Sequence, residues 1–131
     1  MQLFVNLAIT DLPATKTFFE GLGFAFHPQF SDEKALCMII NEHAYYMLLT
    51  EPFFQSFTNK KIADLETSVE AFHAISVESR GEVDTFVDKA LSLGATPDGQ
   101  PPEDHGFMYG RNFRDLDGHV WNVFWMDPAQ G

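Results

Sequence analysis

The sequence has 131 residues, of which 45% are hydrophobic and 21% charged, the composition of one globular domain with a sizeable core. Its formal net charge of -11 repels phosphate backbones and anionic lipids, so we expect neither nucleic acid nor a membrane as a partner. The single cysteine excludes an internal disulfide, and no stretch approaches the ~18 consecutive apolar residues of a membrane span, so we predict a cytoplasmic protein.

The first module, residues 1–51, is predicted to contain a strand, a helix and three more strands. Alternating β-forming residues predict the strand from Leu3 to Ile9. Asp11 is a candidate N-cap for the helix that follows, and Gly23 is its stop signal. Short apolar runs separated by turn residues then predict an antiparallel meander over residues 24–30, 35–40 and 44–50.

The second module, residues 70–127, repeats this order. A strand over residues 72–77 precedes a helix that begins with a capping box at Ser79 and Glu82. Strands over residues 107–113 and 119–126 are joined by Asp117-Gly118, a tight-hairpin signal. A weaker strand is expected over residues 95–100. The repeat indicates two similar units that share one core, which makes residues 1–131 a single domain.

Residues 52–69 form the linker between the modules. Phe53, Phe54 and Phe57 give it an apolar face, and Lys60 and Lys61 add two basic residues. The linker is either a loop packed on the edge of the core, or a flap over a pocket or part of a dimer contact.

The double βαβββ pattern resembles the glyoxalase/bleomycin-resistance/extradiol-dioxygenase superfamily, also called vicinal oxygen chelate proteins. The resemblance rests on the segments ITDL (9–12), LGF (22–24) and FRDLDGHVW (113–121). Within the superfamily the chain is similar to the group of predicted lactoylglutathione lyases, through FVNL (4–7), GFMYGR (106–111) and WMD (125–127).

The resemblance implies an α+β fold in which two βαβββ modules form a curved mixed sheet, with helices on the convex face and a pocket inside the curve. It also implies a homodimer. Metal-dependent members hold a divalent ion with four inward-facing His or Glu side chains from the first and last strands of each half. Such an ion can polarise two neighbouring substrate oxygens.

None of the four ligand positions carries His, Asp or Glu in this sequence, and only Asn122 offers a carbonyl oxygen, which is a weak ligand. The positions are Phe4, Phe72, Asn122 and, in the last strand of the first half, Tyr46 or Leu48. We therefore expect neither a metal nor another cofactor. His73 shares a strand face with Ile75 and is assigned to the helix side.

The remaining histidines offer weaker signals. His43 and His119 follow turns in the two halves and are predicted to be strand-start or surface residues. His105 stands beside Glu103 and Asp104, so this segment is either an acid–base or metal-binding loop or a solvated loop.

The expected pocket has aromatic walls and a few hydrogen-bonding groups, as is typical of small-molecule sites. Arg111 is either the partner of a ligand carboxylate or the partner of Asp104 or Asp115 in a salt bridge. The candidate ligand-binding residues are Phe4, Asn6, Tyr46, Leu48, Phe72, Ser76, Tyr109, Arg111, Asn122 and Phe124.

We predict a protein that binds a small apolar or aromatic molecule in a pocket without metal ligands. The alternative is a metal-dependent lyase or isomerase of the glyoxalase I type with atypical ligands. A third possibility is an oligomerising or regulatory module whose Phe-rich linker contacts a partner.

Overall fold

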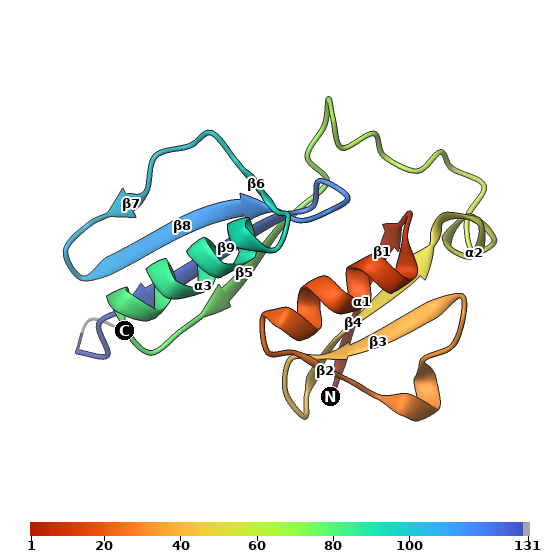
Figure 1. Ribbon diagram of the computed structural model, residues 1–131, viewed down its shortest axis with the longest axis horizontal. Coiled ribbons are helices and arrows are strands. Elements are labelled where there is room, and N and C mark those ends of the chain that lie inside the picture. Colours follow the sequence, from red (N-terminus) through yellow and green to blue (C-terminus); the bar gives the residue numbers. More distant parts are fainter. Residues whose placement is uncertain (130–131) are drawn as a thin grey trace. The chain divides into compact units, whose positions relative to one another are not determined.

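The chain folds into two compact units, Met1–Ile62 and the residues from Ala63 onward, and the computed structural model describes residues 1–129. In the first unit the strands form one sheet in the order β1-β4-β3-β2 (Figure 1), with β1 parallel to β4 and the other pairs antiparallel. The elements of this unit are β1 (Leu3–Ile9), α1 (Leu12–Gly21), β2 (Ala25–Phe26), the 3-10 helix η1 (Pro28–Phe30), β3 (Ala35–Ile39), β4 (Ala44–Thr50) and α2 (Glu51–Gln55).

The signals predicted for the first helix are confirmed. The Asp11 carboxylate accepts a hydrogen bond from the Ala14 N–H at 3.0 Å, and Gly23 adopts a φ of 102° after the helix end. Phe18 and Phe19 are buried on one side of α1, so the helix contributes aromatic rings to the core of this unit.

The strand predicted over residues 24–30 is much shorter in the structure. Only Ala25–Phe26 pair with β3, and η1 follows at once. Pro28 has no N–H to donate to a neighbouring strand, and the His27 ring accepts the Gln29 N–H at 3.3 Å. These two features replace the strand by a turn of 3-10 helix.

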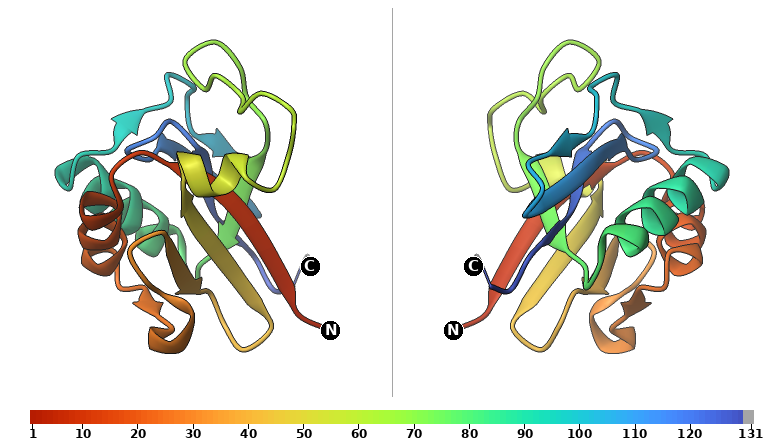
Figure 2. Two further views of the ribbon diagram at one scale, coloured as in Figure 1. Left: turned by 90° about the vertical axis from the view of Figure 1, so that its right-hand side faces the viewer. Right: turned by 90° about the vertical axis from the view of Figure 1, so that its left-hand side faces the viewer.

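The predicted linker begins with a short helix. Figure 2 shows α2 across the end of β1 and β4, and it contacts both strands. Phe53 and Phe54 are half-buried, whereas Phe57 is 70% exposed. This part of the linker therefore packs on the edge of the first sheet, and one of its phenylalanines remains at the surface.

The second unit repeats the strand–helix–strand order. Its sheet has the order β5-β9-β8-β6, with β7 also paired to β8, and β5 runs parallel to β9. Its elements are β5 (Phe72–Ser76), α3 (Arg80–Ser92), β6 (Thr96–Pro97), β7 (Glu103–Asp104), β8 (Met108–Arg114) and β9 (Val120–Met126). The mixed α+β class and the repeated order are as predicted, and each unit has its own sheet.

One face of the second sheet is covered by α3 (Figure 1). The capping box at its start is present, because the Ser79 hydroxyl accepts the Glu82 N–H at 3.1 Å and the Glu82 carboxylate accepts the Glu78 N–H at 3.0 Å. Val83 and Val87 of α3 and Phe113 of β8 are fully buried. We call this side the helix face.

Side chains of alternate parity point to the opposite side, which we call the open face. Phe72 of β5 is 67% exposed there, and Ala74 is paired with Asn122 of β9. None of the helices in the described part of the chain combines the length and apolar character that crossing a membrane would require.

Candidate functional site

The open face of the second sheet carries a hollow of about 680 Å³, within the range of small-molecule sites. Strands β5, β8 and β9 supply its floor, and the segment between β6 and β7 supplies one side. We call it the sheet hollow. It is lined by Val69, Phe72, Ala74, Asp98, Gln100, Pro101, Pro102, Glu103, Arg111, Asn112, Arg114, Val120 and Asn122.

A row of hydrogen bonds crosses the floor of the sheet hollow. The Asn122 amide donates to Asn112 Oδ1 at 2.7 Å, and the Asn112 amide donates to Asp98 Oδ2 at 3.1 Å. Arg114 Nε donates to the other oxygen of Asp98 at 3.0 Å. The Asp98 side chain is only 8% exposed, so its buried charge is balanced by Arg114 and the row is held in place.

Phe72 and Asn122, two of the predicted ligand-binding residues, thus lie together in the sheet hollow. Phe72 adds an exposed ring beside the apolar Val69 and Val120, and Asn122 presents a polar group on the floor. The lining therefore combines apolar walls with amide groups, which suits a partly apolar molecule that makes a few hydrogen bonds.

Tyr109 and Arg111 were predicted to point into the pocket with the other ligand-binding residues, and this prediction is wrong. Both side chains reach α3 on the helix face, where the Tyr109 hydroxyl donates to Asp84 at 2.7 Å. Arg111 donates to Asp84 at 2.9 Å and to Asp88 at 3.0 Å, and not to Asp104 or Asp115. Although Arg111 also borders the sheet hollow, its guanidinium is committed to two aspartates, which explains why it is a poor partner for a ligand carboxylate.

Ser76 and Phe124 are partners in the strand register and lie on the open face, as predicted. They stand one step beyond the Ala74–Asn122 pair. Neither residue is among those that line the sheet hollow, which is confined to the other end of these strands.

On the first sheet, Phe4 and Asn6 are exposed on one face, and the Phe4 ring stacks on Tyr45 with centroids 4.8 Å apart. Tyr46 and Leu48 were predicted to share that face, but their side chains lie on the opposite face of the sheet. They pair with Val5 and Leu7 in the parallel register, and Leu48 is 1% exposed. Both faces of β4 carry large apolar side chains, so alternation in the sequence alone could not decide which face is covered.

The residues at the four expected metal positions do not fit a divalent ion. Phe4 and Phe72 offer only phenyl rings, and Asn122, whose amide nitrogen donates to Asn112, offers a single amide oxygen, which is a weak ligand. Tyr46 and Leu48 lie on the opposite face of their strand from the one the ion would need. These positions therefore do not supply the ligands that a metal-dependent reaction would need.

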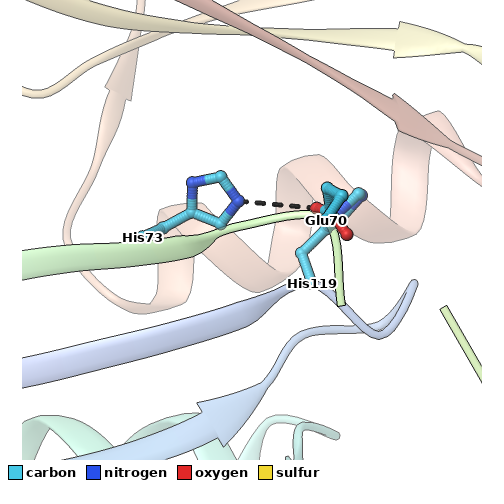
Figure 3. Close-up of side chains that lie close together, drawn as sticks. All are labelled: Glu70, His73 and His119. Carbon is cyan, nitrogen blue, oxygen red and sulfur yellow. Dashed lines mark hydrogen bonds and ion pairs between the residues drawn. The ribbon is translucent and has the colours of Figure 1, made fainter. Parts of the chain in front are cut away.

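A different cluster of possible ligands lies on the helix face. Glu70, His73 and His119 bring one carboxylate oxygen and two ring nitrogens within 4.8 Å of one another (Figure 3). Glu70 Oε1 lies 2.8 Å from His119 Nδ1 and 3.6 Å from His73 Nε2. Both histidines are 4% exposed, and the Glu70 side chain is 29% exposed. We call this group the Glu-His-His cluster.

The pKa values of His73 and Glu70 are both shifted by their surroundings. Burial lowers the pKa of His73 because it disfavours the imidazolium, and the charge of His119 lowers it further. Burial opposes ionisation of Glu70, but hydrogen bonds from His119, from its own backbone and from His73 outweigh it, so the pKa of Glu70 is lowered. The carboxylate form of Glu70 is thus stabilised between two imidazoles.

Sequence reasoning predicted the direction of His73 but missed the cluster. His119 was expected at a strand start or at the surface, and it lies just before β9 but is buried. A signal was available in the sequence. Glu70 and His73 stand at or just before the beginning of one predicted strand, and His119 stands at the beginning of the strand that pairs with it. The other candidate, His105, is 56% exposed and lies 3.7 Å from Glu103, as in a solvated loop.

Comparisons with known proteins agree on the fold. No protein-family model matches the sequence, and no curated protein matches it significantly. The chain is similar to the solved structure of hypothetical protein SA1046 from S. aureus, with 28% identity, coverage of 95% of this chain and 92% of that one, and a TM-score of 0.79. A glyoxalase/bleomycin resistance protein/dioxygenase family enzyme from Burkholderia phytofirmans PsJN has 15% identity, coverage of 94% and 96%, and a TM-score of 0.77.

The fosfomycin resistance protein FosX from Mesorhizobium loti is also similar, with 12% identity, coverage of 99% and 93%, and a TM-score of 0.68. The chain is therefore an α+β protein with two mixed sheets, of four and five strands among the described residues. More particularly, it has the glyoxalase-like, or vicinal oxygen chelate, fold.

Proposed function

We propose that this protein binds a small, neutral, partly apolar molecule in the sheet hollow. The observation that carries the proposal is that the polar row Asn122–Asn112–Asp98 and an exposed Phe72 ring line the same hollow. A hollow with apolar walls and a few fixed hydrogen-bonding groups is the usual form of a small-molecule site.

The charges around the sheet hollow argue for a neutral ligand. Arg114 is paired with Asp98, and Arg111 is paired with Asp84 and Asp88. The protein as a whole carries a net charge of -11, which repels anions. A carboxylate or phosphate would have to displace an existing ion pair, whereas an aromatic compound with an amide or hydroxyl group would not.

The fold supports this proposal only in general terms, because one fold hosts many functions. Binding of small molecules, a homodimer and a cytoplasmic location remain predictions for this chain. We do not extend the proposal to the lyase chemistry of the lactoylglutathione lyase type, because Phe4, Phe72 and Asn122 supply no ligand set at the positions that such chemistry uses.

The test is a thermal-shift screen of neutral aromatic amides and phenols, followed by calorimetry on compounds that raise the melting temperature. Ala74 lies on the floor of the sheet hollow, so Ala74→Phe fills it and should weaken binding at least tenfold. The matched control is Ala25→Phe, at an exposed strand position of the first unit, which should not change the affinity. Ligands that bind Ala74→Phe as tightly as the parent protein would contradict the proposal.

A further inference from the structure

The Glu-His-His cluster is built where two neighbouring parallel strands begin. Glu70 lies two residues before β5, His73 is the second residue of β5, and His119 directly precedes β9. Phe72 is paired with Val120, so the register sets Ala71 opposite His119 and brings the three side chains to one end of the sheet. Figure 3 shows the His73 ring directed at the Glu70 carboxylate, and Glu70 Oε1 also lies 2.8 Å from His119 Nδ1.

The spacing of the three ligand atoms is close to that of a tetrahedral metal site. Zn–N and Zn–O bonds of about 2.0–2.2 Å place the ligand atoms of a tetrahedral zinc about 3.3 Å apart. The two distances from Glu70 Oε1 are 2.8 and 3.6 Å, and all three atoms lie within 4.8 Å of one another. The widest of these separations would have to shorten by up to about 1.5 Å for one tetrahedral ion to contact all three atoms, which rotation of the side chains would have to supply.

Surrounding groups hold these ligands in place. The buried Asp115 carboxylate accepts the backbone N–H of His119 at 3.0 Å and the Trp121 indole N–H at 2.9 Å. The Trp121 ring in turn lies against His73, with centroids 5.1 Å apart. These contacts hold the backbone that carries His119 and restrict the position of the His73 ring.

The chemistry of the group selects a class of ion. Two imidazoles and one carboxylate suit borderline divalent ions such as Zn²⁺, Co²⁺ and Ni²⁺, whereas Mg²⁺ and Ca²⁺ prefer oxygen ligands. Both histidines are buried, and only the Glu70 side is partly open to solvent. An ion would enter from that side, and a water molecule could complete its coordination there.

We propose that Glu70, His73 and His119 bind one Zn²⁺-class divalent ion. The ion joins the segment before β5 to the turn before β9, and its binding stabilises the second unit. This site lies on the helix face and is distinct from the four positions expected from the fold, Phe72 and Asn122 among them. The proposal does not depend on the sheet hollow binding a ligand.

A hydrogen-bonded cluster without metal affinity is the competing explanation of the same geometry. Metal titration of the full chain separates the two. Protein treated with a chelator and exchanged into metal-free buffer is titrated with Zn²⁺ by calorimetry, and with Co²⁺ by visible absorption. We expect one ion per chain, a tetrahedral Co²⁺ spectrum, a rise in melting temperature with Zn²⁺, and no comparable effect of Mg²⁺.

Variants assign the site. Glu70→Gln keeps the size of a partly exposed side chain, so it should fold, and it should weaken Zn²⁺ binding roughly 100-fold or more, because loss of even an outer-shell partner costs 10–100-fold. His119→Asn should act in the same direction. The matched control is His105→Asn, which removes a histidine that lies 3.7 Å from a glutamate in an exposed loop, and it should bind as the parent does.

Absence of stoichiometric Zn²⁺ binding by the folded parent protein would overturn the proposal. So would binding and a Co²⁺ spectrum that persist unchanged in Glu70→Gln, or that are lost in His105→Asn. Circular dichroism of each variant confirms its fold before titration. Because the sheet hollow is tested with other compounds and other variants, either proposal can fail while the other stands.

Discussion

The Tyr109 hydroxyl donates a hydrogen bond of 2.7 Å to the Asp84 carboxylate, which joins β8 to α3. Arg111 donates to the same carboxylate oxygen at 2.9 Å. The hydrogen bond from Tyr109 is the largest cause that lowers the pKa of Asp84, followed among the favourable contacts by that from Arg111. Two hydrogen bonds to Asp84 thus attach α3 to β8 at the edge of an apolar interface.

Tyr109→Phe should raise the pKa of Asp84 and destabilise the protein by about 1 kcal/mol or less, because one hydrogen bond to a half-exposed carboxylate is lost. Phe keeps the ring that lies 4.5 Å from the Arg80 guanidinium, so the stacking contact remains. NMR titration of Asp84 measures the pKa. In the control Tyr45→Phe, whose hydroxyl bonds the Glu42 carbonyl, the pKa of Asp84 should not change.

The same carboxylate makes stability depend on pH. The pKa of Asp84 in the folded protein lies below its ordinary value of 3.8, so its ionised form stabilises the fold above about that pH. This contribution is lost as the pH falls through the lowered pKa. Asp84→Asn should therefore be less stable than the parent at pH 7, and the difference should shrink at low pH.

Urea denaturation of both proteins between pH 7 and the acid limit of folding measures this difference. Glu33→Gln, at an exposed loop carboxylate, is the control. A difference between Asp84→Asn and the parent that stays constant with pH would show that the charge of Asp84 is not involved.

Local signals predicted most of the fold, because short-range contacts determine them. The Asp11 cap, the Ser79 capping box and the Asp117-Gly118 turn all form within a few residues, and each is present in the structure. The strand at residues 44–50 has the predicted bounds. The sequence could not predict which of its side chains share a face with Phe4, because Tyr45 and Tyr46 suit either side of the sheet. The register with β1 decides between them.

The candidate sites depend on pairings that no local pattern contains. Glu70 and His119 are 49 residues apart, and only the parallel pairing of β5 with β9 brings them together. In the sheet hollow, Phe72 and Asn122 were placed on one face by alternation, which the structure confirms. Arg111 was placed there too, but alternation along β8 puts it with Phe113, whose ring packs toward Phe86 of α3.

The cap at the start of α3 should contribute measurably to stability. Ser79→Ala removes the oxygen that accepts the Glu82 N–H and should cost about 1 kcal/mol. Ser92→Ala, at the other end of α3, removes only a hydroxyl that donates to the Lys89 carbonyl and should cost less. Chemical denaturation measures the free energy of unfolding of both variants. An equal decrease for Ser92→Ala and Ser79→Ala would show that the capping hydrogen bond makes no particular contribution to stability.

Gly118 tests whether the segment before β5 packs on the turn before β9. Its φ is 93°, and an added Cβ would lie 3.3 Å from Leu65 Cβ. Gly23 has a φ of 102° with nothing within 4 Å of an added Cβ. Gly23→Ala should therefore lower the free energy of unfolding only by the strain of a left-handed residue, about 1–2 kcal/mol. Gly118→Ala should lower it further, because the added Cβ also makes a tight contact with Leu65.

A double-mutant cycle separates the two contributions. In a Leu65→Gly background the additional loss at Gly118→Ala should disappear, because the Leu65 Cβ that the new methyl group approaches is absent and only the backbone strain at position 118 remains. The free energies of unfolding come from urea denaturation of the single and double variants. Equal losses for Gly23→Ala and Gly118→Ala, or no coupling between positions 65 and 118, would show that this segment does not pack on the turn.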